Sequence, residues 1–171
     1  IGLHIVAEKR ESYDVCFIPD GDLKSFMMPR LARKPEPGPV LDKEGRMLGE
    51  HKGFQFYTIG QRGGLGIAGG KKLYITSIDP VTNTIRLGER SDLFSSGLVA
   101  DRVNLFMEVF PEPLFVKVRY SHKEALCRAG LENGKLHIHF DERQEAVTPG
   151  QSAVLYHDDR VIAGGLIEKV F

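Results

Sequence analysis

The sequence has 171 residues, of which 42% are hydrophobic and 27% charged, and its 23 basic and 23 acidic side chains cancel to a formal net charge of zero. These values are typical of a globular protein with one ordinary domain or two small ones, so they exclude wholesale disorder and a nucleic-acid binder that relies on bulk positive charge. No apolar run approaches the roughly 20 residues of a membrane helix, and two cysteines are too few for a disulfide scaffold.

The first segment of the chain is predicted to contain one short helix followed by a linker. Apolar residues recur at spacings of three and four from Leu23 to Leu31, directly after Asp22, which is a favoured N-cap residue. Three prolines between residues 34 and 39 forbid helix and mark a linker. The start at Ile1, with no charged segment leading into an apolar core, predicts a piece of a longer cytoplasmic protein without a signal peptide.

From Val40 onward the pattern changes to short strands and turns. Two short apolar pairs flank a tight turn at residues 43–45, and a run rich in aromatic residues over 54–59 predicts a further strand. Strands over 73–78 and 84–87 flank a turn and predict a β-hairpin.

A second all-β stretch is predicted after Gly97. Lys117 and Arg119 alternate with valines, which predicts a strand with one largely polar face. Asn133-Gly134 lies between two apolar stretches, a strong signal for a type I′ hairpin, and Asp158-Asp159 marks another hairpin. Short strands with turn signals at roughly 8–12-residue spacing indicate a small closed β-barrel.

The sequence therefore predicts a mainly β protein in three parts. Residues 1–34 form a short helical remnant, residues 35–96 a small β-rich central domain, and residues 97–171 a C-terminal β-barrel.

Several patterns that resemble ligand sites are better explained as ordinary structure. Residues 64–69 match G-x-G-x-x-G, but a strand pattern follows where a dinucleotide site needs a helix N-terminus. His137 and His139 share one strand face without a third ligand at metal-site spacing, so we expect a surface pair and no metal site. Cys127 stands in a plain strand context and is interpreted as structural.

Two features leave a functional and a structural interpretation open. Cys16 lies in a short apolar run beside carboxylates, which would raise the pKa of its thiol, yet the run ends in an acidic turn that would expose the sulfur. Near Tyr120, residues 117–128 include several basic side chains and only one acidic side chain, Glu124. Such a cluster suits contacts with phosphates and an unpaired base, and it equally suits a solvated strand face.

Four blocks of sequence, in order along nearly the whole chain, resemble bacterial tRNA-specific 2-thiouridylases, for which tRNA 2-thiouridylate methyltransferase is an older label. They are Asp14–Asp22, Gly53–Ile67, Arg119-Tyr120 and Ala146–Val154. The stretch YTIGQR with GLGI, followed at a distance by AVTPGQSAV, is the most specific part. The resemblance covers the C-terminal portion of such an enzyme, because the family's N-terminal PP-loop domain and its SGGxDS phosphate loop have no counterpart in this sequence.

The resemblance implies sulfur transfer to C2 of the wobble uridine of certain tRNAs. In the family, ATP with Mg activates the C2 oxygen, and a cysteine persulfide charged by a sulfur-relay protein delivers the sulfur. Cys16 matches the persulfide cysteine, and Arg119, Tyr120 and Gln151 match positions that contact tRNA. The resemblance also implies a cytoplasmic monomer with no membrane association. This chain alone is expected to bind no ATP and to be inactive.

Two other classes of function compete with this interpretation. One is a non-catalytic RNA-binding β-barrel module, which requires no role for Cys16. The other is a β-rich interaction domain that makes no RNA contact, for which a change at Arg119 would leave tRNA affinity unchanged.

Overall fold

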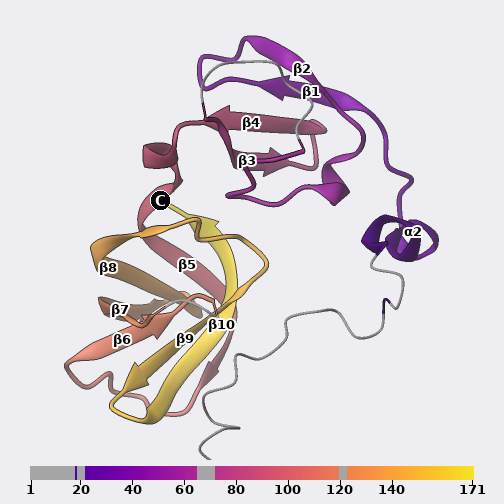
Figure 1. The fold of residues 1–171 in the computed structure, drawn as a ribbon. Coiled ribbons are helices and arrows are strands. Elements are labelled where there is room, and N and C mark those ends of the chain that lie inside the picture. Colours follow the sequence, from indigo (N-terminus) through magenta and orange to yellow (C-terminus); the bar gives the residue numbers. More distant parts are fainter. Residues whose placement is uncertain (1–17, 19–21, 65–71, 120–122) are drawn as a thin grey trace, which may run out of the picture. The chain divides into compact units, whose positions relative to one another are not determined.

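The computed structural model describes residue 18 and residues 22–64, 72–119 and 123–171 (Figure 1). Two compact units, Ile1–Pro35 and Glu36–Phe171, divide the chain. The architecture is mainly β, as predicted, with a four-stranded sheet and a closed six-stranded barrel in the second unit. None of the helical segments in the described ranges has the length and apolar character needed to cross a lipid bilayer.

The first unit contains the helix α2 (Leu23–Met27) and the 3₁₀ turn η1 (Met28–Arg30). The backbone N–H of Ser25 donates to the Asp22 carboxylate at 3.1 Å, so Asp22 caps the helix as the sequence predicts. The α-helical part ends before Leu31, the last residue of the predicted pattern. Pro29 explains this early end, because it has no backbone N–H with which to continue the hydrogen-bond ladder.

The four-stranded sheet has the strand order β2-β1-β4-β3. Its strands are β1 (Gly38–Leu41), β2 (Met47–His51), β3 (Tyr74–Asp79) and β4 (Thr84–Gly88). Both predicted turns join antiparallel neighbours, β1 with β2 and β3 with β4, while β1 and β4 run parallel. Four buried side chains form the core of the sheet, namely Val40, Ile75, Ile85 and Leu87.

Two predictions for this region are wrong. Residues 54–59 do not form a strand, because Gly53 turns the chain at φ 119° and a 3₁₀ turn, η2 (Phe54–Phe56), follows. The aromatic run instead packs Phe54 and Tyr57 individually against the core. The linker also ends earlier than predicted, because Gly38 and Pro39 belong to β1. Pro39 is tolerated because it pairs only with β2, and pairing with β4 begins at the next residue.

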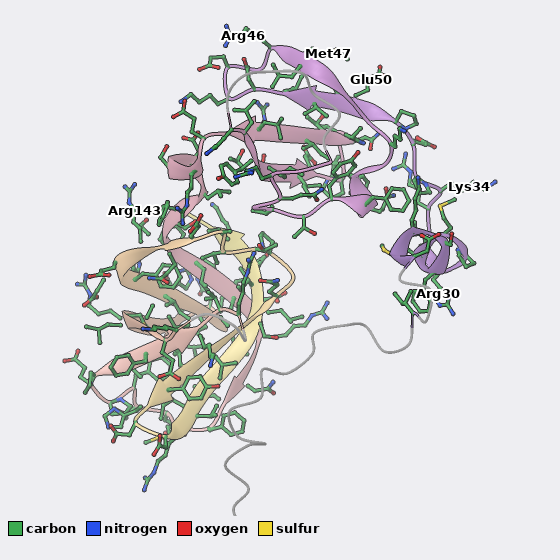
Figure 2. All side chains as sticks on the ribbon, viewed as in Figure 1. Arg30, Lys34, Arg46, Met47, Glu50 and Arg143 are labelled. Carbon is green, nitrogen blue, oxygen red and sulfur yellow. The ribbon has the colours of Figure 1, made fainter. Side chains whose placement is uncertain are left out.

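Strand β2 is an edge of this sheet; its charged side chain, Glu50, is exposed, whereas His51 at its end is buried. Figure 2 shows Arg46, Met47 and Glu50 along this outer edge, all in solvent. Charged side chains on an edge strand discourage pairing with a strand of another molecule.

The barrel closes through the strand order β10-β5-β8-β7-β6-β9. Its strands are β5 (Phe94–Leu105), β6 (Leu114–Lys117), β7 (Ala125–Glu132), β8 (Lys135–Glu145), β9 (Ser152–His157) and β10 (Arg160–Val170). The 3₁₀ turn η3 (Arg90–Leu93) precedes β5, and the Arg90 guanidinium donates two hydrogen bonds of 2.8 Å to the Glu145 carboxylate. The predicted closed barrel is therefore confirmed.

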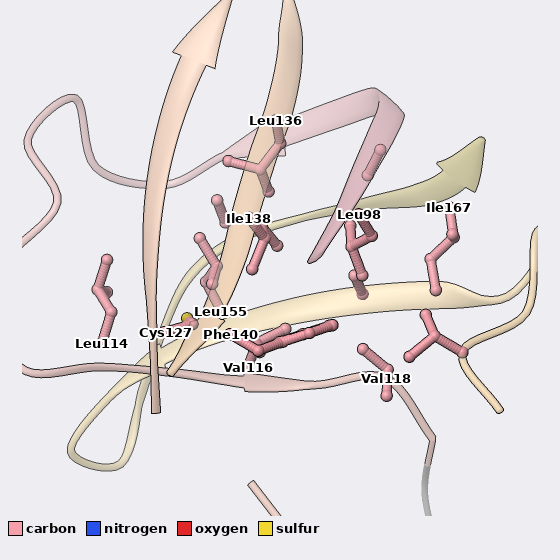
Figure 3. Packing of buried hydrophobic residues seen from close by; sticks show 14 of the residues in the cluster. Leu98, Leu114, Val116, Val118, Cys127, Leu136, Ile138, Phe140, Leu155 and Ile167 are labelled. Atoms are coloured by element: carbon pink, nitrogen blue, oxygen red, sulfur yellow. The ribbon is translucent and has the colours of Figure 1, made fainter. Parts of the chain in front are cut away.

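Both hairpins predicted within the barrel are present. Asn133 and Gly134 have φ values of 51° and 75°, the left-handed pair that a type I′ turn requires, and Asp158 turns the next hairpin at φ 50°. Alternate residues of β6 point inward, and Figure 3 shows Val116 in the buried cluster with Leu98 of β5 and Ile138 of β8. Alternation of apolar and polar positions thus fixes which face of each strand lines the core.

Cys127 lies in this barrel core, and we expect its thiol to be unreactive in the folded protein. Its side chain is 4% exposed, and burial raises the pKa of the thiol from 9.0 to about 12, with a smaller contribution from Asp141 (Figure 3). In a Cys16→Ser variant at pH 8, a thiol reagent should label no cysteine in the native state and one in denaturant. Rapid native labelling would contradict the assignment.

The same pKa shift gives the direction of a pH effect on stability. The unfolded chain loses the Cys127 proton near pH 9.0 and the folded chain near 12, so the thiol's contribution to stability is complete below 9.0 and is lost as the pH rises through this window.

Candidate functional site

The barrel topology brings Arg119 next to Gln151, although 32 residues separate them in sequence. β6 pairs with β9 such that Lys117 lies opposite Val154. Continuing this antiparallel register places Arg119, just beyond β6, beside the start of β9, where Gln151 precedes the strand. Two of the residues singled out by the sequence are therefore brought together.

The guanidinium of Arg119 is held by three acceptors. Its Nε–H donates to Oε1 of Gln151 at 3.2 Å, and its Nη2 donates to the carbonyl of Ala146 at 2.6 Å and to Oγ1 of Thr148 at 3.0 Å. The Thr148 hydroxyl itself donates to the same Ala146 carbonyl at 2.9 Å. We call Arg119, Ala146, Thr148 and Gln151 the Arg119–Gln151 cluster. All of its residues except Arg119 belong to the AVTPGQ block.

The loop that supplies the acceptors is anchored by its backbone at both ends. Ala146, at φ 52°, donates its N–H to the carbonyl of Leu93 at 2.9 Å. At the other end, Gly150 donates to the carbonyl of Ile167 at 2.8 Å, and Ile167 donates back to the carbonyl of Gln151 at 2.7 Å. The acceptors are thus fixed before any ligand arrives, which lowers the entropy cost of positioning the guanidinium.

The positive charge of Arg119 is not neutralised by any carboxylate within 4 Å in the described residues, because all three acceptors are neutral groups. The N–H groups of Nη1 also have no acceptor among those residues. Arg119 is half-buried, which reduces screening of its charge by water. Such an oriented, unpaired guanidinium edge is suited to an anionic oxygen, above all a phosphate.

The other specific block, TIGQR, forms a structural turn that contacts this loop. Gln61 closes the turn by accepting from the N–H of Thr58 at 3.2 Å and donating to the carbonyl of Gly63 at 2.8 Å. Gly60 has φ 87°, and a Cβ placed on it would lie 3.2 Å from the Cβ of Ala146. Close approach of the two blocks therefore favours glycine here, next to the residue whose carbonyl holds Arg119.

The remaining sequence candidates divide into two groups. Cys16, Tyr120, His122 and residues 65–69 of the glycine-rich motif lie outside the described residues. Among the other cations of the predicted basic cluster, Arg128 lies 3.9 Å from the carboxylate of Asp141 and Lys123 is exposed. The sequence did not single out Ala146 or Thr148, because a carbonyl and a hydroxyl acceptor become recognisable only once the loop is folded.

The paired histidines have surface contacts rather than a ligand geometry. The Nε2 of His137 lies 3.9 Å from the Glu132 carboxylate, and the ring of His139 packs 5.2 Å from that of Phe171. Within the ranges that the structure describes, no three His, Cys, Asp or Glu side chains are grouped to hold a metal.

Comparison with known families matches most of the chain to two domain families. Residues 24–89 match the family described as tRNA methyl transferase PRC-barrel domain, and residues 95–167 match the aminomethyltransferase beta-barrel domain family. These two matches meet close to the start of β5.

Curated relatives are similar over nearly the whole chain. The tRNA-specific 2-thiouridylase MnmA 1 of Clostridium botulinum is 41% identical over 173 residues, which cover 99% of this chain and 48% of the relative. A tRNA-specific 2-thiouridylase of Clostridium perfringens has the same identity and coverage over 174 residues. That of Carboxydothermus hydrogenoformans is 41% identical over 169 residues, covering 96% of this chain and 46% of the relative. The chain spans about half the length of the curated relatives it matches.

Proposed function

Because the chain belongs to the tRNA-specific 2-thiouridylase family, we propose that it is the C-terminal portion of an enzyme that thiolates C2 of the wobble uridine in tRNA. In this proposal the barrel contacts tRNA and the segment around Cys16 delivers sulfur. The protein acts as a monomer in the cytoplasm, and a separate sulfur-relay protein supplies the sulfur.

The Arg119–Gln151 cluster is the observation that supports tRNA contact. A phosphate is the most frequent partner of an exposed arginine edge in nucleic-acid complexes, and its contact positions the RNA without reading its sequence. Gln151 keeps its amide N–H groups for a second acceptor while its Oε1 holds Arg119. A rigid cation beside an amide is suited to hold the tRNA backbone.

Cys16 is the proposed sulfur carrier. In this step the terminal sulfur of a Cys16 persulfide attacks C2 of the ATP-activated uridine and displaces the activated oxygen as AMP. A second thiol, supplied from outside this chain, then attacks the Sγ of Cys16, which breaks the S–S bond, leaves the sulfur on C2 and forms a disulfide with Cys16. Reduction of that disulfide by an external thiol frees Cys16 to be recharged by the relay protein. The other cysteine of the sequence, Cys127, is buried in the barrel core, which leaves Cys16 as the candidate for this role.

In the part of the chain that the structure describes, the residues do not fit ATP or Mg. In the described ranges no group of three possible metal ligands is present, and the only α-helix there, α2, has five residues. The sequence has neither an SGGxDS nor a Walker A loop to hold phosphates. We therefore assign ATP activation to the part of the longer relatives that this chain does not cover, and we expect the 171-residue chain alone to be inactive.

An Arg119→Ala variant of the chain is expected to bind tRNA about tenfold more weakly than wild type, because one charged hydrogen bond to phosphate is lost. The measurement is a titration of a fluorescent tRNA transcript at several salt concentrations. The slope of log affinity against log salt should fall by about one, the value for one phosphate contact.

The matched control is Arg143→Ala, which removes an exposed arginine of β8 that Figure 2 shows extended into solvent. This variant should stay within about twofold of wild type, since bulk charge contributes little in a protein of zero net charge. Equal loss in both variants would point to non-specific attraction. No loss in Arg119→Ala, with an unchanged melting curve, would reject the tRNA site and favour a protein interaction domain.

A further inference from the structure

A hollow of about 250 Å³ lies on the outside of the barrel, over β9, β10 and β5. Three aligned residues mark its position across the strands, since Val154 of β9 lies opposite Gly164 of β10, which lies opposite Asn104 of β5. Gly164 has no side chain and so leaves the middle of this row open. The next residue, Gly165, is required by close packing, because a Cβ there would lie 2.6 Å from the carbonyl oxygen of Asp101.

An aromatic ring and a cation line the hollow. Phe106 is 68% exposed, an unusual exposure for a phenylalanine, although its backbone N–H is fixed to the carbonyl of Ile162 at 3.0 Å. Arg102, at φ 47°, is exposed beside it. No carboxylate lines the hollow, and none lies within 4 Å of Arg102 among the described residues.

The hollow adjoins the Arg119–Gln151 cluster. Ser152, which lines the hollow, follows Gln151 directly in the chain, about 3.3 Å further along the strand. Ser152 also pairs with Leu166, another lining residue, and the neighbouring Ile167 donates its N–H to the carbonyl of Gln151. The hollow and the cluster are therefore built on neighbouring residues of β9 and β10.

We propose that this hollow binds an unpaired base of the tRNA, which stacks on Phe106 while an adjacent phosphate contacts Arg102. The inference rests on the proposed function and extends it from one phosphate contact to a second, base-binding contact. A flat apolar ring, a cation without a neighbouring acid and the polar amide of Asn104 are the combination that holds single-stranded RNA. Polar side chains at Arg102, Asn104 and Ser152 line the hollow together with apolar ones, so a protein partner is the alternative occupant that the test below separates from RNA.

The test is the affinity of the 171-residue chain for a fluorescent tRNA transcript. Phe106→Ala should weaken binding about tenfold, the effect expected for one base–aromatic stack, and Phe106→Tyr, which keeps a ring, should bind like wild type. Val109→Ala is the control, because Val109 is 75% exposed in the same loop and does not line the hollow. Arg102→Gln should lower the salt slope by about one.

The outcomes separate this inference from the proposed function. If Arg119→Ala weakens binding and Phe106→Ala, with an unchanged melting curve, does not, the hollow has no role in RNA binding and a protein partner becomes the alternative. If Phe106→Ala and Val109→Ala weaken binding equally, general exposure of apolar surface explains the effect and the inference fails. If the wild-type chain binds no tRNA, both proposals fail for this barrel.

Discussion

Replacing Cys16 by serine in a full-length 2-thiouridylase that contains this sequence is expected to abolish thiolation of tRNA. A serine hydroxyl cannot carry a persulfide, so the sulfur that must reach C2 of the uridine has no carrier. Loss of a group that acts covalently on substrate lowers turnover by more than about a thousandfold. ATP-dependent activation of the uridine should persist, because it does not use this thiol.

The measurement is the incorporation of labelled sulfur into a tRNA transcript, with pyrophosphate release followed in parallel. Cys127→Ala is the matched control, because it removes the only other cysteine of the sequence from a position without access to RNA. It should retain thiolation. Normal thiolation by the Cys16→Ser enzyme would remove Cys16 from the mechanism, and loss of pyrophosphate release would indicate a folding defect instead.

Replacing His51 by alanine is expected to destabilise the second unit by about 3 kcal/mol, because it leaves two buried polar groups unpaired and a cavity. The side chain of His51 is 1% exposed. Its Nε2 bonds to the carbonyl of Asn83 at 3.0 Å, and its Nδ1 accepts from the N–H of Gly53 at 3.0 Å. These partners fix the tautomer with the proton on Nε2, since a carbonyl only accepts and an amide N–H only donates.

The surroundings of His51 leave little room for compensation. Gly38 lies opposite His51 in the sheet, and a Cβ on Gly38 would lie 2.2 Å from the Asn83 carbonyl oxygen. Asn83 itself donates to the carbonyl of Pro37 at 2.9 Å. The imidazole therefore ties the start of β1, the end of β2 and the β3–β4 turn together, and its removal affects all three.

Denaturant unfolding of the 171-residue chain, followed by far-UV circular dichroism, measures this effect. Lys52→Ala is the control, because it shortens an exposed side chain next to His51 and should change the free energy of unfolding by less than about 0.5 kcal/mol. A loss below about 1 kcal/mol for His51→Ala would show that the two hydrogen bonds are not needed for the fold.

Local sequence signals predicted the hairpins and the barrel because the deciding interactions are local. Asn133-Gly134 fixes its turn through two left-handed residues, and alternation along β6 fixes which residues enter the core. The failure at residues 54–59 has a tertiary cause. Their β propensity is real, but Gly53 turns the chain before them and none of the described strands pairs with them, so the aromatic residues pack one by one.

The candidate site was only partly accessible from the sequence. The resemblance assigned Arg119 and Gln151 to tRNA contact, but their mutual hydrogen bond depends on the β6–β9 register, which no local signal specifies. The hollow beside Phe106 depends on three strands from distant parts of the sequence, so it was not predicted at all. Sites assembled from several strands are found from the fold, and residue types alone do not reveal them.

The order of strands in the barrel has a consequence for how the protein is made. β5 and β10 are hydrogen-bonded neighbours, with Leu98 opposite Val170, so the ring closes only after the ribosome has delivered residue 170. Contacts between residues so far apart in the sequence form slowly, because the entropy cost of closing a long loop comes before the contacts stabilise the fold. The four-stranded sheet, complete by Gly88, can fold during synthesis. The RNA-binding surface that we propose lies on β5, β9 and β10, and it therefore forms last.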